Sequence, residues 1–294
     1  LEDLLESDDL QWSTIADQLR ATKKQFGKDW VIDGIKRGQR LTEFDTAGEV
    51  EDVPIEAMID REPITVVCSQ MGWIRAMTGH IDLGRELKFK DGDGPRFIFH
   101  AETTDRLLVF GSNGRFYTVS AANLPGGRGM GEPLRLMVDL PNEVQIVSLF
   151  IHQPGRKLLV ASTAGDGFVV PEDDVVAQTR SGKQVLNVRG EGVSALVCHP
   201  VSGDSVATVG ENRKVLVFGL DELPEMGRGK GVRLQKYKDG GLSDATTFTR
   251  EAGLSWQDPA GRTRTEADLA EWTGKRASSG RMAPRGFPRD NKFT

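Results

Sequence analysis

The stretch from Leu107 to Gly131, LLVFGSNGRFYTVSAANLPGGRGMG, contains the pattern that decides the fold. Two short apolar runs flank an Asn-Gly turn, and a glycine-rich segment that carries Arg128 follows the second run. Apolar runs joined by an Asn-Gly turn predict a β-hairpin. The architecture then depends on whether the chain builds this hairpin once or several times.

The hairpin pattern occurs five times along the chain. The other copies are PITVVCSQMGWIRAMTG, RKLLVASTAGDGFVVPEDDV, DSVATVGENRKVLVFGLDEL and the weaker AGLSWQDPAGRTRTEADLAEW. The turn positions, separated by 42, 51, 47 and 49 residues, are Gly72, Gly114, Gly165, Asn212 and Gly261. A period of 40–50 residues with about four strands in each unit predicts a propeller-like array. We therefore expect a mainly β protein with five blades over residues 63–294, and an irregular β-sandwich is the alternative.

Glycine-rich basic loops follow the hairpins of the second to fifth repeats. They read LPGGRGMGEPL, AQTRSGKQVL, LPEMGRGKGVRL and TGKRASSGRMAPRGF, whereas the first repeat has the mixed-charge TGHIDLGRELKFKDGDG. Glycine lets a backbone approach a surface closely, and arginine and lysine bind phosphates. Because equivalent loops of a propeller lie on one rim, this pattern predicts a surface that follows a curved polyanion, for which bent duplex DNA is the natural candidate.

The predicted phosphate contacts are the cations of these loops. They are Arg128, Arg180, Lys183, Arg228, Lys230, Arg233, Lys275, Arg276, Arg281 and Arg285. A second, weaker set lies at or beside the hairpin turns, where many hairpins carry a solvated cation: Arg115, Arg213, Lys214, Arg262 and Arg264. Solvated turns without a partner are the alternative interpretation of both sets.

The N-terminal segment has a helical pattern. Leu5, Trp12, Leu19 and Phe26 recur every seven residues, with Leu1, Asp8, Ile15 and Thr22 as the companion set, up to Gly27. This heptad predicts the end of a coiled-coil arm over residues 1–37, and an amphipathic helix packed on the body is the alternative. Residues 38–62 are acidic and weakly patterned, which predicts a linker.

Composition limits the class of protein. The chain has 294 residues, a net charge of −5 and two cysteines. Residues 1–62 carry a net charge of −8, so the rest is mildly basic, and local patches decide nucleic-acid binding. No apolar run is long enough for a membrane span, and the acidic start excludes a signal peptide. Cys68 and Cys198 lie in apolar runs, and we expect both to be reduced core residues of a cytoplasmic protein.

These repeats resemble the C-terminal domain of the A subunit of bacterial type IIA topoisomerases, and most closely the topoisomerase IV branch. The motifs that carry the resemblance are EPITVVCSQMGWIRAMTGH, GSNGRFYTVSAANLPGGRGMGEPL, STAGDGFVV and MGRGKG. The resemblance implies a β-pinwheel whose blades exchange strands and whose rim binds and bends duplex DNA. It also implies a holoenzyme of two A subunits with two B subunits, associated with the chromosome, in which the domain favours decatenation and relaxation.

Two alternatives to this function stay open. A gyrase-type domain, which wraps DNA fully, carries a Gln-Arg-Arg-Gly-Gly-Lys-Gly box in its first blade. Only degenerate versions occur here, at residues 126–131 and 227–231. A propeller that docks a protein partner would instead show apolar and aromatic hot spots on its rim.

No catalytic site is expected in this chain. Tyr117 and Tyr237 lack the family's cleavage context, and His80, His100, His152 and His199 lack metal-ligand spacing. We expect no cofactor here, and the resemblance assigns Mg and ATP to other parts of the holoenzyme. The aromatic residues beside the turns, Trp73, Phe116 and Phe168, are expected to pack in the core.

Overall fold

A computed structural model describes residues 7–26, 30–32, 35–37, 60–258 and 260–293. The chain divides into two units, Leu1–Pro54 and Ile55–Thr294. The predicted linker, residues 38–62, lies almost entirely outside the described residues, so its character stays a prediction.

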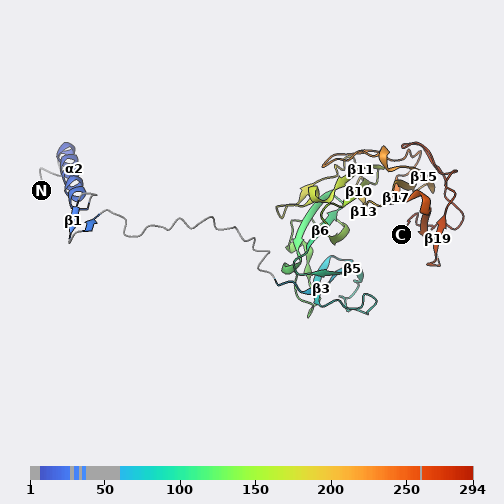
Figure 1. The fold of residues 1–294 in the computed structure, drawn as a ribbon, viewed down its shortest axis with the longest axis horizontal. Coiled ribbons are helices and arrows are strands. Elements are labelled where there is room, and N and C mark those ends of the chain that lie inside the picture. The colour runs from blue at the N-terminus through green and yellow to red at the C-terminus, as the bar shows by residue number, and fades with distance from the viewer. Residues whose placement is uncertain (1–6, 27–29, 33–34, 38–59, 259, 294) are drawn as a thin grey trace. The chain divides into compact units, whose positions relative to one another are not determined.

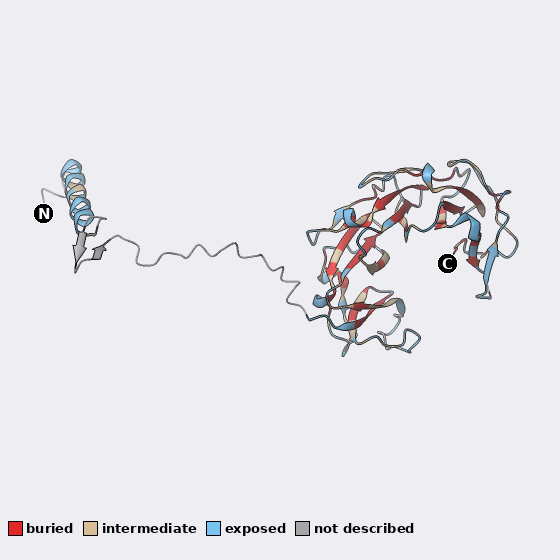
Figure 2. Cartoon of the chain, in the orientation of Figure 1, coloured by how far each residue is buried: buried red, intermediate tan, exposed pale blue. Residues whose placement is uncertain are grey.

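Helix α2 (Asp8–Phe26) forms the first unit together with a short sheet. The Ser7 hydroxyl accepts a hydrogen bond from the Leu10 amide at 3.4 Å. Asp8 and Asp9 in the first turn interact favourably with the positive end of the helix dipole. Trp12 is 70% exposed and Leu19 64% exposed, and Figure 2 shows the helix almost wholly in the exposed colour. The described heptad residues Trp12, Ile15 and Leu19 are therefore exposed within this unit, and a coiled-coil partner for them stays a prediction.

A two-stranded sheet, β1 (Trp30–Ile32) and β2 (Ile35–Arg37), follows the helix. The predicted helical segment extended to residue 37 and so included this stretch. The residues at 33 and 34 read Asp-Gly, a favoured hairpin connection, which is the sequence signal for this sheet.

The second unit is built from repeated antiparallel hairpins. Each of the first four repeats supplies three long strands. Figure 1 shows the sheets of this unit following one another along an arc that begins at β3. The strands of these repeats are β3 (Pro63–Ser69), β4 (Trp73–Thr78), β5 (Pro95–Glu102), β6 (Arg106–Gly111), β7 (Arg115–Ser120), β9 (Ile146–Ile151), β10 (Lys157–Ser162), β11 (Asp166–Pro171), β13 (Ala195–Pro200), β14 (Ser205–Gly210), β15 (Lys214–Gly219) and β17 (Leu242–Phe248).

A fourth, outer strand reaches each of these sheets from the following repeat. The sheet orders are β5–β3–β4–β8, β9–β6–β7–β12, β13–β10–β11–β16 and β17–β14–β15–β20. The outer strands are β8 (Glu132–Pro133), β12 (Lys183–Gln184), β16 (Val232–Arg233) and β20 (Arg281–Met282). Strand exchange therefore runs in one direction, from each repeat back to the one before it.

Short 3-10 helices lie between the long strands. They are η2 (Ala121–Asn123), η3 (Leu134–Leu136), η4 (Glu172–Val175), η5 (Leu220–Glu222) and η6 (Arg250–Ala252).

The hydrophobic core lies between successive sheets. Leu107 and Val109 of β6 face the first sheet, whereas Leu108 and Phe110 face the third. Because successive side chains of a strand point to opposite faces, each sheet contributes to the two cores beside it. Four such cores join the five repeats. Figure 2 shows buried residues in red along the strands of this unit. Two of the three predicted core aromatics, Phe116 and Phe168, belong to the second core. The third, Trp73, is half-buried with the Lys90 ammonium over its ring and belongs to none of the four cores.

The hairpin turns confirm four of the five predicted positions. Gly72, Gly114, Gly165 and Gly261 have φ between 74° and 80°, which favours glycine. In the fourth repeat the positive φ, 60°, belongs to Arg213 and not to Asn212. The Asn212 side chain instead accepts the Lys214 amide at 3.1 Å, so the predicted position was wrong by one residue.

The fifth repeat differs from the other four. It forms a two-stranded sheet of β18 (Leu254–Gln257) and β19 (Thr263–Glu266), and no further strand joins this sheet within the described residues. The later segment supplies Phe287, which packs against Trp256, and Phe293, which packs against Phe287, both in the fourth core. The Arg213 side chain holds this segment, donating to the carbonyls of residues 287 and 288 at 3.1 and 2.8 Å.

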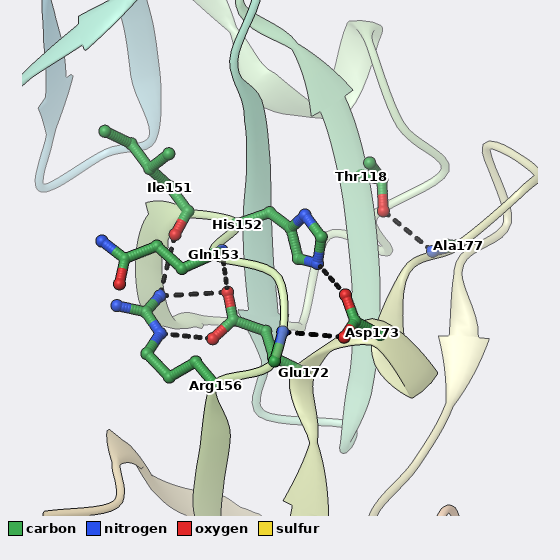
Figure 3. A network of polar contacts seen from close by, with 9 residues as sticks. Thr118, Ile151, His152, Gln153, Arg156, Glu172, Asp173 and Ala177 are labelled. Atoms are coloured by element: carbon green, nitrogen blue, oxygen red, sulfur yellow. Dashed lines mark hydrogen bonds and ion pairs between the residues drawn. The ribbon is translucent and has the colours of Figure 1, made fainter.

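A buried ion pair joins the connection between the second and third sheets to η4. The Glu172 carboxylate is fully buried and accepts the Arg156 guanidinium at 2.5 and 3.0 Å and the Gln153 amide at 2.7 Å. In Figure 3 these groups converge on the turn before β10, beside the His152 to Asp173 contact of 3.0 Å. The pair fixes the turn that leads from one blade to the next.

Candidate nucleic-acid interface

Four segments carry the chain from a hairpin to its outer strand in the preceding sheet. We call them exchange loops one to four, and they comprise residues 124–131, 176–182, 223–231 and 272–280. They are the glycine-rich basic loops of the sequence.

Each exchange loop is bonded to the second strand of the preceding hairpin. In loops one, three and four a strand amide donates to a loop carbonyl: Ala76 to Pro125 at 2.8 Å, Val169 to Pro224 at 3.1 Å and Val217 to Trp272 at 2.8 Å. In loop two the Ala177 amide donates to the Thr118 hydroxyl at 2.8 Å instead. The loops therefore have fixed positions on the sheets.

The last glycine of each loop is required by the strand exchange. Gly131, Gly182, Gly231 and Gly280 all have positive φ, and a Cβ on any of them would lie 2.3–2.6 Å from a strand carbonyl oxygen. Other loop glycines, such as Gly126 and Gly129, have open space around them. The final glycine of each loop therefore lets the outer strand dock, whereas Gly126 and Gly129 leave the backbone accessible.

Neighbouring exchange loops are also connected. The Asp139 amide donates to the Arg180 carbonyl at 2.9 Å, the Asn187 amide to the Gly229 carbonyl at 2.7 Å, and the Ala277 amide to the Leu234 carbonyl at 2.8 Å. Each bond joins a loop to the chain just after the previous outer strand. We call the four loops with β8, β12, β16 and β20 the loop rim, and it is one hydrogen-bonded path.

Six of the ten predicted contacts are available on the loop rim or just after it. Their side chains are exposed and have no hydrogen bond or ion pair within the described part of the chain: Arg128, Arg228, Arg233, Lys275, Arg281 and Arg285. We call these six the unpartnered cations.

The other four predicted contacts are already engaged. The Arg180 side chain donates to the Leu136 carbonyl, Lys183 to the Asp174 carbonyl, and Lys230 lies 3.1 Å from the buried Asp166 carboxylate. Arg276 donates to the carbonyls of residues 222 and 233 at 3.0 and 2.8 Å. These four hold the rim together, and their role as phosphate contacts stays a prediction.

The sequence and the fold match one well-defined group of proteins. The family model described as DNA gyrase C-terminal domain, beta-propeller, matches residues 105–153, 156–197 and 204–242, which are the second to fourth repeats. The A subunit of DNA topoisomerase 4 from Caulobacter vibrioides is 50% identical over 251 residues, or 85% of this chain and 33% of that protein. That of Rickettsia bellii is 42% identical over the whole chain and 39% of its own length. The chain thus spans between a third and two fifths of these relatives.

The solved structures agree. The Escherichia coli ParC C-terminal domain superposes with a TM-score of 0.67 at 28% identity, covering 78% of this chain and 96% of that one. The chain belongs to the family of C-terminal domains from topoisomerase IV A subunits. The predicted propeller-type fold and the predicted family are therefore confirmed.

The two degenerate gyrase-type boxes of this topoisomerase IV domain lie in exchange loops one and three, at residues 126–131 and 227–231. Their final glycines are Gly131 and Gly231, which dock outer strands. In each box the arginine, Arg128 or Arg228, is unpartnered within the described residues.

Four of the five cations in the second, weaker set donate to backbone carbonyls or pair with an acid. Arg115 donates to the carbonyls of residues 181 and 182 in loop two at 3.1 and 3.2 Å. Arg262 and Arg264 lie 3.4 and 3.3 Å from the Asp258 carboxylate, and backbone amides with these cations hold the pKa of that acid below its ordinary value. Arg213 holds the segment after β20, whereas the half-buried Lys214 has no side-chain partner in the described chain.

Sequence reasoning missed Arg75, which positions the first exchange loop. It is 5% exposed in β4, and its guanidinium donates to the Gly129 carbonyl at 2.5 Å and the Lys88 carbonyl at 2.8 Å. An arginine inside an apolar strand run was the available signal, because a buried cation must find partners.

The remaining polar candidates have structural roles. Tyr117 is fully buried in the first core, and Tyr237 packs against the third. Both cysteines are buried and free, and burial raises the pKa of Cys68 to about 12. No cluster of metal-ligating side chains occurs among the described residues, and no described helix is long and apolar enough to cross a membrane.

Proposed function

We propose that this domain binds duplex DNA along the loop rim and bends it, as part of the A subunit of a topoisomerase IV. The continuity of the loop rim supports the proposal, because this hydrogen-bonded path contains five of the six unpartnered cations, all except Arg285. The sheets that it joins follow one another along the arc of Figure 1. Arginine and lysine neutralise phosphates without regard to sequence. A duplex that follows successive cations along an arc has to bend.

In the whole enzyme the domain would guide the choice of DNA crossings for ATP-dependent decatenation and relaxation. Cleavage, Mg and ATP would belong to other parts of an assembly of two A subunits with two B subunits, acting on the chromosome in the cytoplasm.

The test is duplex binding by the full chain over a salt series. Arg128→Gln with Arg228→Gln removes two unpartnered cations, and Lys23→Gln with Lys24→Gln removes the same charge from α2 as the matched control. We expect the first pair to reduce the slope of log K against log salt by about 1.8, since each phosphate contact contributes about 0.9. The loss should be equal for unrelated sequences.

Bending is measured on the same proteins with end-labelled duplexes, whose ends should approach one another on binding. Absence of binding at low salt, or equal slopes for the two double variants, would overturn the proposal. Binding without approach of the ends would overturn the bending role alone.

A further inference from the structure

A cationic groove lies on the first sheet, between exchange loop one and the chain after β4. It has a volume of about 340 Å³. Its walls include Arg85, Glu86 and Lys88 on one side and Arg128 and Met130 on the other, with Met77 between them. The first repeat, whose sequence has no glycine-basic cluster, thus faces the first cation of the loop rim.

Charge distinguishes this groove from others on the same unit. Arg75, Arg85, Lys88 and Arg128 stand against Glu86 alone, a net charge of +3. The groove beside loop four has Lys214 and Arg281 against Glu271, a net charge of +1.

A third groove, beside β10 and η5, is acidic. It is lined by one cation, Lys157, and three acids, Asp204, Asp221 and Glu225. A fourth groove, lined by Arg96 and Arg135 without an acid, has a net charge of +2. The first-sheet groove therefore has the largest net positive charge of the four.

The protein itself fixes both walls of this groove. The buried Arg75 guanidinium donates to the Gly129 carbonyl in one wall and to the Lys88 carbonyl in the other, at 2.5 and 2.8 Å. The Lys90 ammonium lies 3.1 Å from the centroid of the Trp73 ring, which anchors the end of the first wall. The two walls of the groove are therefore in place before any ligand binds.

The cations that face the groove are not used in holding it. Arg85, Lys88 and Arg128 are all exposed, and their side chains have no hydrogen bond or ion pair within the described residues. The buried Arg75 holds the two walls of the groove together, and the three exposed cations stay available for a ligand. Cations on two opposed walls suit a chain of phosphates that passes between them.

We propose that this groove binds the phosphodiester backbone of duplex DNA, with Arg85 and Lys88 as contacts that extend the loop rim onto the first repeat. The inference rests on the proposed function, because Arg128 belongs to both surfaces. Arg75 acts as a positioning residue that sets the width of the groove. The DNA path then begins one repeat earlier than the glycine-basic pattern indicates.

The experiment compares two double variants of the full chain, Arg85→Gln with Lys88→Gln and the control Lys23→Gln with Lys24→Gln. We expect the groove variant to reduce the salt slope by about 1.8 and the affinity at 0.1 M salt by about 60-fold, and the control to change neither comparably. Glu86→Gln should tighten binding, because it removes the one acid of the groove. A hydroxyl-radical footprint should shorten at one end in the groove variant.

Arg75→Lys tests the positioning role, because it keeps the charge but cannot reach both carbonyls. This variant should lower the slope of log K against log salt. Its thermal unfolding is recorded as a check that it still folds.

The outcomes separate the two proposals. Failure of the unaltered chain to bind DNA would overturn the proposed function. If Arg128→Gln with Arg228→Gln weakens binding but the groove variant matches its control, the groove inference alone is wrong.

Discussion

Replacing Gly131 by alanine should detach β8 from the first sheet, whereas the same change at Gly129, two residues earlier, should not. Gly131 has φ 86°, and an alanine Cβ would lie 2.3 Å from the Ile74 carbonyl oxygen. No atom lies within 4 Å of a Cβ at Gly129. The two positions share a loop but differ in backbone conformation and in what surrounds the added carbon.

The expected loss for Gly131→Ala is about 3 kcal/mol. A left-handed backbone costs an alanine about 1–2 kcal/mol. The contact with a backbone oxygen cannot be relieved by a rotamer, so the strand has to move and lose hydrogen bonds worth about 1 kcal/mol each. One of these is the Leu134 amide bond to the Gly72 carbonyl at 2.9 Å. For a unit of this size the unfolding temperature should fall by about 6–12 °C.

The assay is thermal unfolding of the two single variants, together with amide exchange at Leu134. Gly131→Ala should lower the transition and speed exchange at Leu134, and Gly129→Ala should match the unaltered chain. Equal losses for both variants, or unchanged exchange in Gly131→Ala, would refute the assignment of Gly131 to strand docking.

Three further predictions concern groups away from the rim. Arg156→Ala should cost about 3–5 kcal/mol of unfolding free energy in urea titration, because it leaves a buried carboxylate unpaired, whereas the exposed Lys157→Ala should cost under about 1 kcal/mol. Cys68 should react with a thiol reagent at pH 8 only after unfolding, since burial raises its pKa to about 12. Partial burial and then the nearby Lys292 charge lower the pKa of His199 despite the neighbouring Asp244. The unfolded chain therefore takes up this proton at a higher pH than the folded chain, and the free energy of unfolding declines as pH falls. Thermal stability should therefore fall between about pH 7 and 5, and less so in a His199→Gln variant.

The hairpins could be predicted from the sequence because each has its own local signal. Apolar alternation marks the strands, and a glycine marks four of the turns. The fourth turn shows the limit of that signal, since Arg213 adopts φ 60° where Asn212 was expected to turn. Three hydrogen bonds from its guanidinium to the distant segment at residues 287–291 stabilise that conformation.

The outer strands could not be derived from a periodic pattern. Each of β8, β12, β16 and β20 is two residues long, too short to show alternation, and pairs with a different repeat. Their exchange was expected only from the family resemblance. Glu172 illustrates the same limit, because PEDDV looks like an acidic surface run, yet its first acid is fully buried against Arg156.

The candidate site was predicted at the level of its loops but not of its side chains. Arg128 and Lys230 occupy similar glycine-rich contexts, and only the folded chain shows that one is unpartnered and the other lies 3.1 Å from Asp166. The groove on the first sheet was missed because its cations come from two repeats.

The one-way strand exchange also has a consequence for synthesis on the ribosome. The first hairpin closes once Thr78 has emerged, but its outer strand begins at Glu132, after the whole second hairpin. The same delay recurs at the second, third and fourth sheets. Each of these four sheets therefore keeps an unpaired edge strand until the next repeat is synthesised, and the four are completed in order from the N-terminal one.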